Sequence, residues 1–325
     1  MKRLLIALLL WTAAATPLRA ACKLGKVADL KPIVSDYRVY VPGKINGKDV
    51  LFMVDSGANT LLFRDAAEAL GMSLAGYAGE TYGATGHESA DVKASIESLE
   101  LGKWSGRNFA LRAVGPGGDS KFGGVTVIGV LGEDILSHFD VEMNLQEGVF
   151  HLYQPEGCES ANLAYWTDSY NVLDMIGDPP GQPRIRVAVQ INDRQVTALI
   201  DTGAPYTHLS LDIARALGVS PESPGVQPAG PVVGIHGQAE PSWTGVFNSF
   251  SFDQERISPA KINMYRFAKG DSEGSRIRQA NFDFDMLIGF DFLRAHHVLF
   301  SHSQRKVYLS YVGGQPFISP KPRPD

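Results

Sequence analysis

Two stretches of the chain place a turn between two short runs rich in apolar and β-branched residues, and each stretch predicts a β-hairpin. The runs and their turns are 38–41, Asn46-Gly47 and 50–54 in the first half, and 184–187, Asn192-Asp193 and 196–200 in the second. Asn, Gly and Asp suit these turns because they tolerate the positive φ that the turns require. Each hairpin ends at an aspartate, Asp55 or Asp201, nine residues after the Asn of its turn. A carboxylate is therefore expected at the tip of each second strand.

The segments that follow the two aspartates repeat in the same order. Each half continues with a short helical stretch, a glycine-rich hairpin tip, and two apolar residues followed by Gly. These landmarks are 64–71, 83–86 and 130–132 in the first half, and 211–218, 234–237 and 287–289 in the second. With the hairpin that ends at the aspartate, chance would have to reproduce four landmarks in one order, so the chain is predicted to contain an internal duplication.

The repeat predicts an all-β chain with short helices and two domains. About 300 residues are too many for one modest core, and 34 Gly and 19 Pro scattered along the chain favour many turns. The predicted parts are a signal peptide (1–20), an N-terminal lobe (37–154), an interlobe linker with one strand at 170–173 (155–183), a C-terminal lobe (184–312) and a Pro-rich tail (313–325). The end of the tail is expected to be disordered or extended, because its alternate prolines cannot join a sheet.

The first residues have the pattern of a cleaved secretory signal peptide. A positively charged start precedes the apolar run 4–15, and small residues follow at Ala20 and Ala21. The run is too short to cross a bilayer, so cleavage after Ala20 is expected. Lipid modification of Cys22 is the alternative, but Arg19 stands where that motif needs an apolar residue. The protein is therefore predicted to be exported, periplasmic or secreted, without a membrane span.

The net charge and the cysteine and histidine residues indicate which partners, disulfides and metals to expect. The net charge is −5 and no basic block is present, so nucleic acid is not an expected partner. The two cysteines, Cys22 and Cys158, are a candidate disulfide in an oxidising compartment, with two unpaired thiols as the alternative. Two cysteines do not make a metal site, and the histidines near the last strand (His296, His297 and His302) are expected to be surface or hydrogen-bonded side chains rather than ligands. No metal or cofactor is expected.

The candidate chemistry lies in the two aspartate motifs. In each motif a hydroxyl residue and a glycine follow the aspartate, giving Asp55-Ser56-Gly57 and Asp201-Thr202-Gly203. Two carboxyl groups brought face to face can share one proton, because neighbouring like charges resist ionising together. Such a pair can activate water as an acid and a base.

The paired motifs resemble those of aspartic peptidases, in particular the bacterial retropepsin-like group. The resemblance covers the two lobes, from about Tyr37 to Tyr153 and from Arg184 to Tyr311. The two lobes share one chain, as in pepsins, but Ala follows the Gly in both motifs, as in retropepsins. The resemblance implies two acid-protease-like β-barrel lobes and hydrolysis of a peptide or protein substrate by a monomer.

The resemblance also implies roles for individual residues. Asp55 and Asp201 would hold a water, one as general base and the other as the acid that polarises the scissile carbonyl. Ser56 and Thr202 would reach across to the backbone of the opposite lobe, while Gly57 and Gly203 would allow close approach of backbone to the carboxylates. The second-motif glycines, Gly132 and Gly289, would pack beneath the aspartate loops. Flap and substrate-binding residues would be Tyr82, Gly83, Gly86, Gly234 and Gly237; Tyr82 is equally interpreted as a half-buried strand aromatic.

Two departures from the family pattern affect the expected activity. Retropepsins usually carry Asp where this chain has Asn59 and Pro205, so the substrate preference is open. Pepsins carry hydroxyl residues where this chain has Ala58 and Ala204. Because those hydroxyls favour the charged pair, their loss predicts higher pKa values than in pepsins and activity at mildly acid to neutral pH.

Two other functions compete with the peptidase. A catalytically silent two-lobed module could bind a peptide or a cell-wall component, and two chains could assemble by strand exchange. The covalent repeat makes assembly unnecessary. Because both Asp, both hydroxyl residues and both Gly are intact, the peptidase is favoured.

Overall fold

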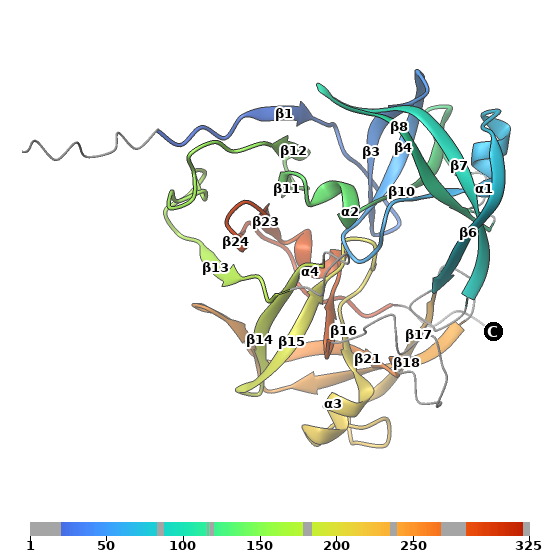
Figure 1. Cartoon of the computed structure of the whole chain (residues 1–325). Coiled ribbons are helices and arrows are strands. Elements are labelled where there is room, and N and C mark those ends of the chain that lie inside the picture. The colour runs from blue at the N-terminus through green and yellow to red at the C-terminus, as the bar shows by residue number, and fades with distance from the viewer. Residues whose placement is uncertain are drawn as a thin grey trace, which may run out of the picture.

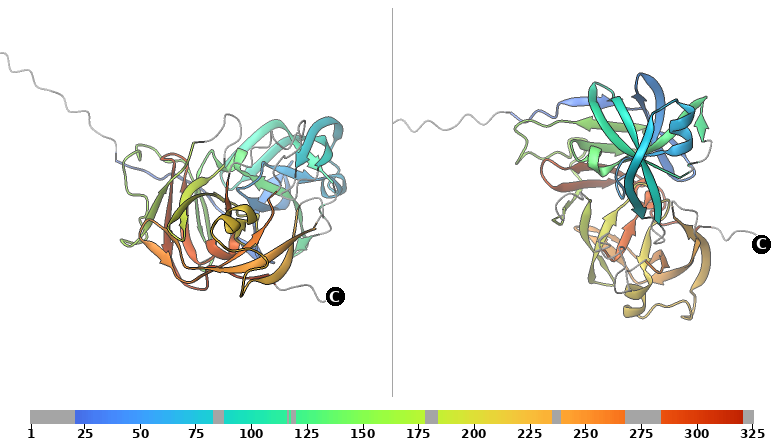
Figure 2. Two further views of the ribbon diagram at one scale, coloured as in Figure 1. Left: turned by 90° about the horizontal axis from the view of Figure 1, so that it is seen from below. Right: turned by 45° about the vertical axis from the view of Figure 1, so that its right-hand side comes forward.

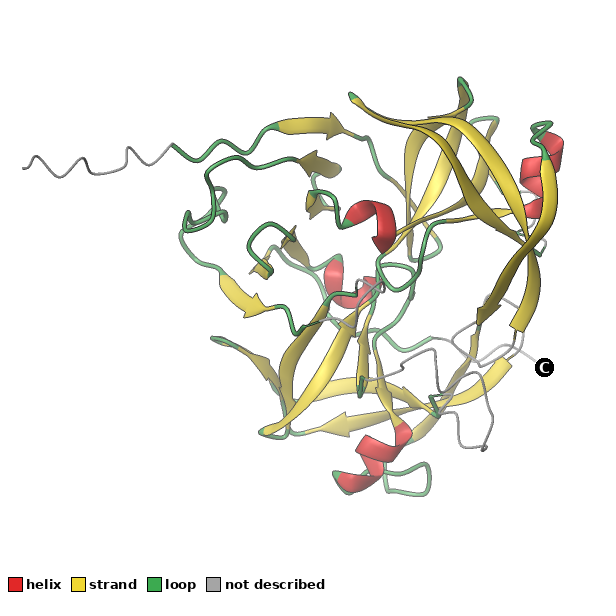
Figure 3. Ribbon diagram, in the orientation of Figure 1, coloured by secondary structure: helices red, strands yellow, loops and turns green. Residues whose placement is uncertain are grey.

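The computed structural model describes residues 21–82, 88–115, 117, 120–177, 184–234, 239–267 and 284–320, with backbone alone for 80–82 and 88–90. The predicted signal peptide (1–20) lies outside the described residues, as do part of the linker and the end of the tail. The described residues form three β-sheets and four short helices (Figures 1 and 3). The helices are α1 (Arg64–Ala69), α2 (Glu133–Leu136), α3 (Leu211–Ala216) and α4 (Phe290–Leu293).

The first half of the chain forms a nine-stranded sheet, six strands of which close into a barrel. Its strands are β2 (Ile33–Ser35), β3 (Arg38–Ile45), β4 (Lys48–Asp55), β5 (Leu61–Phe63), β6 (Leu74–Tyr82), β7 (Glu88–Leu101), β8 (Trp104–Val114), β9 (Lys121–Phe122) and β10 (Val125–Gly132). They follow the order β2-β3-β4-β10-β5-β8-β7-β6, with β9 paired to β10. Pairing of β3 with β7, at Ile45 and Leu99, closes the barrel.

The second half repeats this arrangement in its own nine-stranded sheet. Its strands are β14 (Arg186–Ile191), β15 (Arg194–Ile200), β16 (His208–Ser210), β17 (Gln227–Val233), β18 (Ala239–Phe247), β19 (Phe250–Phe252), β20 (Glu255–Ile257), β21 (Ala260–Tyr265) and β22 (Met286–Ile288). In both halves the strand that leads to the aspartate lies parallel to the strand that leads to the second-motif glycine. The predicted all-β fold with internal duplication is confirmed, and the right-hand view of Figure 2 shows the two lobes one above the other.

The hairpins at the start of each lobe form as the sequence predicts. Asn46 and Gly47 have φ of 49° and 75°, and Asn192 and Asp193 have φ of 50° and 63°. These values lie in the left-handed region that Asn, Gly and Asp tolerate best. The tight turns put the two strands of each hairpin in register and so determine where each aspartate emerges.

A third, six-stranded sheet joins the two halves. It consists of β1 (Lys26–Asp29), β12 (Val149–Tyr153), β11 (Asp140–Asn144), β23 (His296–Ser301), β24 (Lys306–Tyr311) and β13 (Asn171–Asp174), in that order. β11 from the first half pairs with β23 from the second. The interlobe segment therefore contributes a strand, β13, to the shared sheet. The largest hydrophobic core contains buried residues of both lobes and of this sheet.

The ends of the described chain are fastened to this framework. A disulfide joins Cys22 to Cys158, whose Cα atoms lie 4.4 Å apart. At the other end Phe317, within the segment expected to be a tail, is 4% exposed and packs on Phe250 and Phe292 with ring centroids 5.2 and 5.8 Å away. In the described part of the chain, no helix is long and apolar enough to cross a membrane.

Substitution of Phe317 tests whether this terminal segment belongs to the core. Phe317→Ala is expected to lower the free energy of unfolding by about 3 kcal/mol, because a buried aromatic ring is removed and a cavity is left. Val246→Ala, at a side chain that is 55% exposed, should change it by less than about 0.5 kcal/mol. Urea unfolding followed by circular dichroism measures both; equal values for the two variants would contradict the docking of the segment.

Candidate active site

The two aspartates end equivalent strands and meet where the lobes touch. Asp55 is the last residue of β4 and lies in register with Gly132 of β10, while Asp201 directly follows β15. A Cβ atom built on Gly57 would lie 2.5 Å from Cγ of Asp201, and one on Gly203 would lie 2.3 Å from Cγ of Asp55. Each carboxyl group therefore packs against the glycine of the opposite motif, where no side chain would fit.

Backbone N–H groups orient the two carboxyl groups unequally. The Gly57 N–H donates to Asp55 Oδ1 at 2.9 Å. The Gly203 and Ala204 N–H groups both donate to Asp201 Oδ1, at 2.9 and 3.1 Å. Because N–H donors stabilise a carboxylate over the neutral acid, Asp201 is the better placed of the two to carry the negative charge.

The pKa values of the pair follow from this geometry. Both side chains are partly accessible to solvent but otherwise enclosed by protein. Burial, the charge of Asp201 and the hydrogen bond to it raise the pKa of Asp55 well above its usual value. Burial also raises the pKa of Asp201, although the hydrogen bonds from Asp55, Gly203 and Ala204 act in the opposite direction. The shared proton is therefore favoured on Asp55.

The hydroxyl groups after the aspartates link the two loops. Thr202 Oγ1 accepts a hydrogen bond from the Ser56 N–H at 2.9 Å, and Ser56 Oγ accepts one from the Thr202 N–H at 3.1 Å. Ser56 Oγ also donates to the carbonyl of Ile200 at 2.8 Å. Both side chains are 2% exposed, so these cross-lobe bonds form out of contact with bulk water.

The second-motif glycines support the loops from the other side. A Cβ on Gly132 would lie 2.3 Å from the carbonyl carbon of Asn59 and 2.4 Å from the Thr60 nitrogen. A Cβ on Gly289 would lie 2.6 Å from the carbonyl carbon of Tyr206. In each lobe the backbone of the aspartate loop therefore rests directly on the backbone of the second motif.

A threonine–aspartate pair, which the sequence analysis missed, joins each aspartate loop to the second motif. Asp134 Oδ1 accepts hydrogen bonds from the Thr60 N–H at 2.6 Å and from its hydroxyl at 2.7 Å, and Thr60 Oγ1 accepts one from the Gly132 N–H at 2.9 Å. The second lobe repeats the three contacts, at 2.8, 2.7 and 3.0 Å, with Thr207, Asp291 and Gly289. The sequence contains a signal for these aspartates, since an Asp stands two residues after the Gly in both second motifs.

These pairs also show that the two loops differ in length. Thr60 is the fifth residue after Asp55, whereas Thr207 is the sixth after Asp201. The extra residue falls in the segment Pro205-Tyr206, so Asn59 has no single counterpart in the second lobe.

The flap residues are described only in part. Tyr82 ends β6, and its backbone pairs with that of Glu88 in β7. Gly234 is half-buried and directly follows β17. The side chain of Tyr82 and the residues Gly83, Gly86 and Gly237 lie outside what the structure describes, so their part in substrate binding stays a prediction.

A contact between a buried glutamate and a histidine joins the two lobes near the aspartate loops. Glu133 Oε1 lies 3.0 Å from His302 Nε2, and the two side chains are 1% and 14% exposed. Both residues line a small cavity together with Ser56 and Thr202. The sequence gives no sign of this pairing, because Glu133 and His302 come from different lobes.

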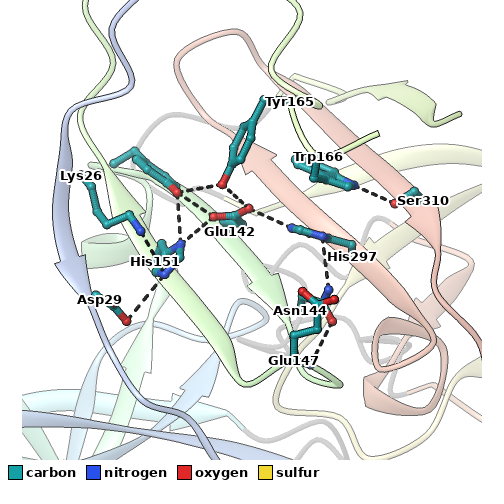
Figure 4. A network of polar contacts seen from close by, with 11 residues as sticks. Lys26, Asp29, Glu142, Asn144, Glu147, His151, Tyr165, Trp166, His297 and Ser310 are labelled. Carbon is teal, nitrogen blue, oxygen red and sulfur yellow. Dashed lines mark hydrogen bonds and ion pairs between the residues drawn. The ribbon is translucent and has the colours of Figure 1, made fainter. Parts of the chain in front are cut away.

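A polar network centred on Glu142 crosses the shared sheet (Figure 4). Glu142 lies on β11 and accepts hydrogen bonds from the hydroxyls of Tyr153 and Tyr165 at 2.7 and 2.6 Å. His151 Nδ1 and His297 Nε2 lie 2.7 and 2.8 Å from the same carboxylate. Burial acts to raise the pKa of Glu142, but the bonds from His297, Tyr165, Tyr153 and His151 outweigh it and lower the pKa to about 2. Glu142 therefore links strands from both halves to the interlobe segment as an ionised group.

The two histidines at the start of β23 bond to protein groups. His297 stacks on Trp166 of the interlobe segment, with ring centroids 3.9 Å apart (Figure 4). His296 is fully buried, with Nδ1 2.8 Å from the Phe292 carbonyl and Nε2 3.0 Å from Glu255. Within the described ranges no group of three or more His, Cys, Asp or Glu side chains could hold a metal ion.

Comparisons with known proteins agree with the repeat. The sequence model of a family described as "Aspartyl protease" matches residues 41–135 and 187–292, one aspartate motif in each range. No curated protein sequence matches the chain. Among solved structures, an aspartic proteinase from Irpex lacteus matches with a TM-score of 0.47 and 13% identity, over 90% of this chain and 97% of that chain.

The lowered pKa of Glu142 predicts a pH-dependent contribution to stability. A carboxyl group whose pKa is lower in the folded than in the unfolded chain stabilises the folded state. This contribution is complete at pH values above the pKa of the unfolded chain, near 4.5, and is lost as the pH falls toward 2. Glu142→Gln is therefore expected to lower the free energy of unfolding by about 3 kcal/mol at pH 7 and by clearly less at pH 3. Denaturant unfolding at both pH values measures the change.

The matched control is Glu97→Gln, at an exposed carboxylate on β7. This change should have little effect at either pH. A loss for Glu142→Gln that is the same at pH 7 and pH 3 would contradict the ionised state of the network.

Proposed function

Because the chain belongs to the aspartyl protease family, we propose that it is an aspartic endopeptidase that hydrolyses peptide bonds with a water activated by Asp55 and Asp201. The observation that carries this proposal is the contact between the two motifs, in which each carboxyl group lies against the opposite glycine. Two carboxyl groups held in this way share one proton and so provide an acid and a base together.

The unequal hydrogen bonding supports one assignment of the two roles. Asp201 receives two N–H donors and acts as the general base that takes a proton from water. Asp55 carries the shared proton and donates a hydrogen bond to the scissile carbonyl oxygen as the water oxygen attacks its carbon. Collapse of the tetrahedral intermediate breaks the C–N bond, and the proton that Asp201 took from water passes to the leaving nitrogen, which restores the singly protonated pair. Water and protein groups account for every proton in this sequence.

The disulfide between Cys22 and Cys158 supports export of this peptidase to an oxidising compartment. Both aspartates come from one chain, so the proposed site is complete in a monomer. The competing function, a silent peptide- or cell-wall-binding module, would keep the fold but would not need the shared proton.

Substitution of either aspartate tests the mechanism. Asp55→Asn and Asp201→Asn are each expected to lower kcat on a peptide library by about a hundredfold to ten-thousandfold, because the acid or the base is removed. Asp168→Asn, at an exposed aspartate of the interlobe segment, should retain wild-type turnover. Thermal melting checks that the variants are folded. Wild-type turnover in either active-site variant would disprove the mechanism and favour the binding module.

The raised pKa values predict the pH range of activity. The base must be ionised and the acid protonated, so kcat/KM rises with pH as Asp201 loses its proton and falls as Asp55 loses its own. Because both pKa values are raised, the optimum is expected at mildly acid to neutral pH, above the range of unperturbed carboxyl groups. A pH–rate profile with an optimum near pH 2 would contradict this prediction.

A further inference from the structure

The terminal segment, residues 315–320, runs from the shared sheet across the second lobe to β17. The side chain of Phe317 is buried in the core, and the N–H of Gly230 in β17 donates to the carbonyl of Pro320 at 3.3 Å. Between these two contacts lies Ile318, whose backbone bonds to buried side chains. The segment is therefore held by its backbone as well as by an aromatic anchor.

Two side chains of the second lobe bond to both polar groups of the Ile318 backbone. Its N–H donates to Asp291 Oδ2 at 3.1 Å, and its carbonyl accepts a hydrogen bond from Asn263 Nδ2 at 2.8 Å. Asp291 is 0% exposed and Asn263 is 1% exposed. The Thr244 hydroxyl donates to Asn263 Oδ1 at 2.8 Å, which turns the amide NH2 of Asn263 toward Ile318. Because a buried polar group without a partner is costly, the docked segment completes the hydrogen bonding of both side chains.

The same two side chains hold Thr207, in the loop that follows Asp201. Asp291 Oδ1 accepts hydrogen bonds from the N–H and the hydroxyl of Thr207 at 2.8 and 2.7 Å. The Asn263 amide also donates to the Thr207 carbonyl, with Nδ2 3.4 Å from the oxygen. Thr207 is 1% exposed. Asp291 and Asn263 therefore each bridge the terminal segment and the aspartate loop.

Backbone hydrogen bonds connect Asp291 to the residues that orient Asp201. The N–H of Asp291 donates to the carbonyl of Pro205 at 3.2 Å, and the N–H of Phe290 donates to the carbonyl of Ala204 at 2.8 Å. Ala204 in turn supplies one of the N–H donors to Asp201 Oδ1. Asp291 is therefore bonded to the loop one residue away from a donor that stabilises the carboxylate of Asp201.

The equivalent carboxyl group of the first lobe has different surroundings. Asp134 also bonds to the threonine of its loop, Thr60, but it is half-buried. The full burial of Asp291, to which Ile318 contributes, therefore distinguishes the loop that carries Asp201.

We propose that Asp291 and Asn263 are positioning residues for Asp201, and that docking of Ile318 between them keeps the aspartate loop in place. The inference rests on the proposed peptidase function, in which Asp201 is the general base. A small displacement of such a group is enough to slow a reaction, because proton transfer requires close alignment. Undocking of the segment would leave two buried polar groups without a partner and allow the loop to shift.

Hydrogen exchange followed by mass spectrometry tests this link without a substrate. Ile318→Pro removes the N–H that Asp291 accepts, whereas Ile318→Ala keeps it and is the matched control. In the full-length chain with Ile318→Pro, the amides of 201–210 are expected to exchange about five to thirty times faster than in wild type, because the loop opens more readily. The amides of the equivalent loop in the first lobe, 55–63, should be unchanged in both variants.

A second variant, Asn263→Asp, tests the other side chain. It keeps the oxygen that accepts from Thr244 but removes the donor to Ile318 and Thr207, so it should also speed exchange in 201–210. Unchanged exchange in this range for Ile318→Pro, or an equal acceleration in 201–210 and 55–63, would overturn the inference. The same criteria apply to Asn263→Asp if the proline variant does not fold.

Kinetic measurements test whether the loosened loop affects the reaction. Ile318→Pro is expected to lower kcat about fivefold to thirtyfold with little change in KM. The acid limb of the pH–kcat profile should move to higher pH, because the N–H donors that stabilise ionised Asp201 are less well placed. Ile318→Ala should keep the wild-type values.

Two outcomes separate the positioning role from the alternatives. A purely structural role would reduce the amount of folded enzyme without moving the pH profile, so an unchanged profile and an unchanged kcat per folded molecule would overturn the inference. A wild type that cleaves no peptide would contradict the proposed function instead. The exchange rates of 201–210 would then still decide whether the terminal segment holds the loop of Asp201.

Discussion

Two carboxyl groups in contact repel each other when both are ionised, and the structure must hold them together against that repulsion. Gly57 and Gly203 let each carboxyl group approach the opposite loop. The hydroxyls of Ser56 and Thr202 then fasten the loops with hydrogen bonds formed out of contact with bulk water. Because a buried donor or acceptor without a partner is costly, separating the lobes would expose the site and break these bonds at once.

The shared sheet also holds the two lobes together, at a distance from the aspartates. Pairing of β11 with β23 joins strands from the two halves, and Glu142 adds a polar network that also holds the interlobe segment. The two carboxyl systems respond to acid in opposite ways. Burial and mutual repulsion favour protonation of Asp55, whereas donors from four side chains keep Glu142 ionised to about pH 2. At mildly acid pH the proposed site can therefore hold its proton while the network that joins the lobes remains charged.

The sequence predicted what depends on local order along the chain. The turns at Asn46 and Asn192 form in the predicted conformation, and the repeat placed one aspartate at the end of each hairpin; its role in catalysis stays a prediction. Some contacts between distant segments could not be foreseen. The Glu133–His302 contact depends on how the two lobes pack, and the burial of Phe317 depends on the aromatic side chains that surround it in the folded chain. The burial of a residue cannot be predicted from its own segment of the sequence, because it depends on how the other segments pack around it.

The duplication makes the two halves of the site nearly equivalent, but a peptide has a direction and a symmetric site cannot distinguish its two ends. The two halves differ by one extra residue in the loop after Asp201. That loop adds the Ala204 N–H to the hydrogen bonds of Asp201, which removes the equivalence of the two carboxyl groups. The same loop carries Tyr206, which packs on Tyr37, whereas Asn59 of the shorter loop accepts a hydrogen bond from Arg184. In the proposed peptidase, these differences are expected to distinguish the acid from the base and one side of a bound peptide from the other, so the choice of roles and the orientation of the peptide are expected to be coupled.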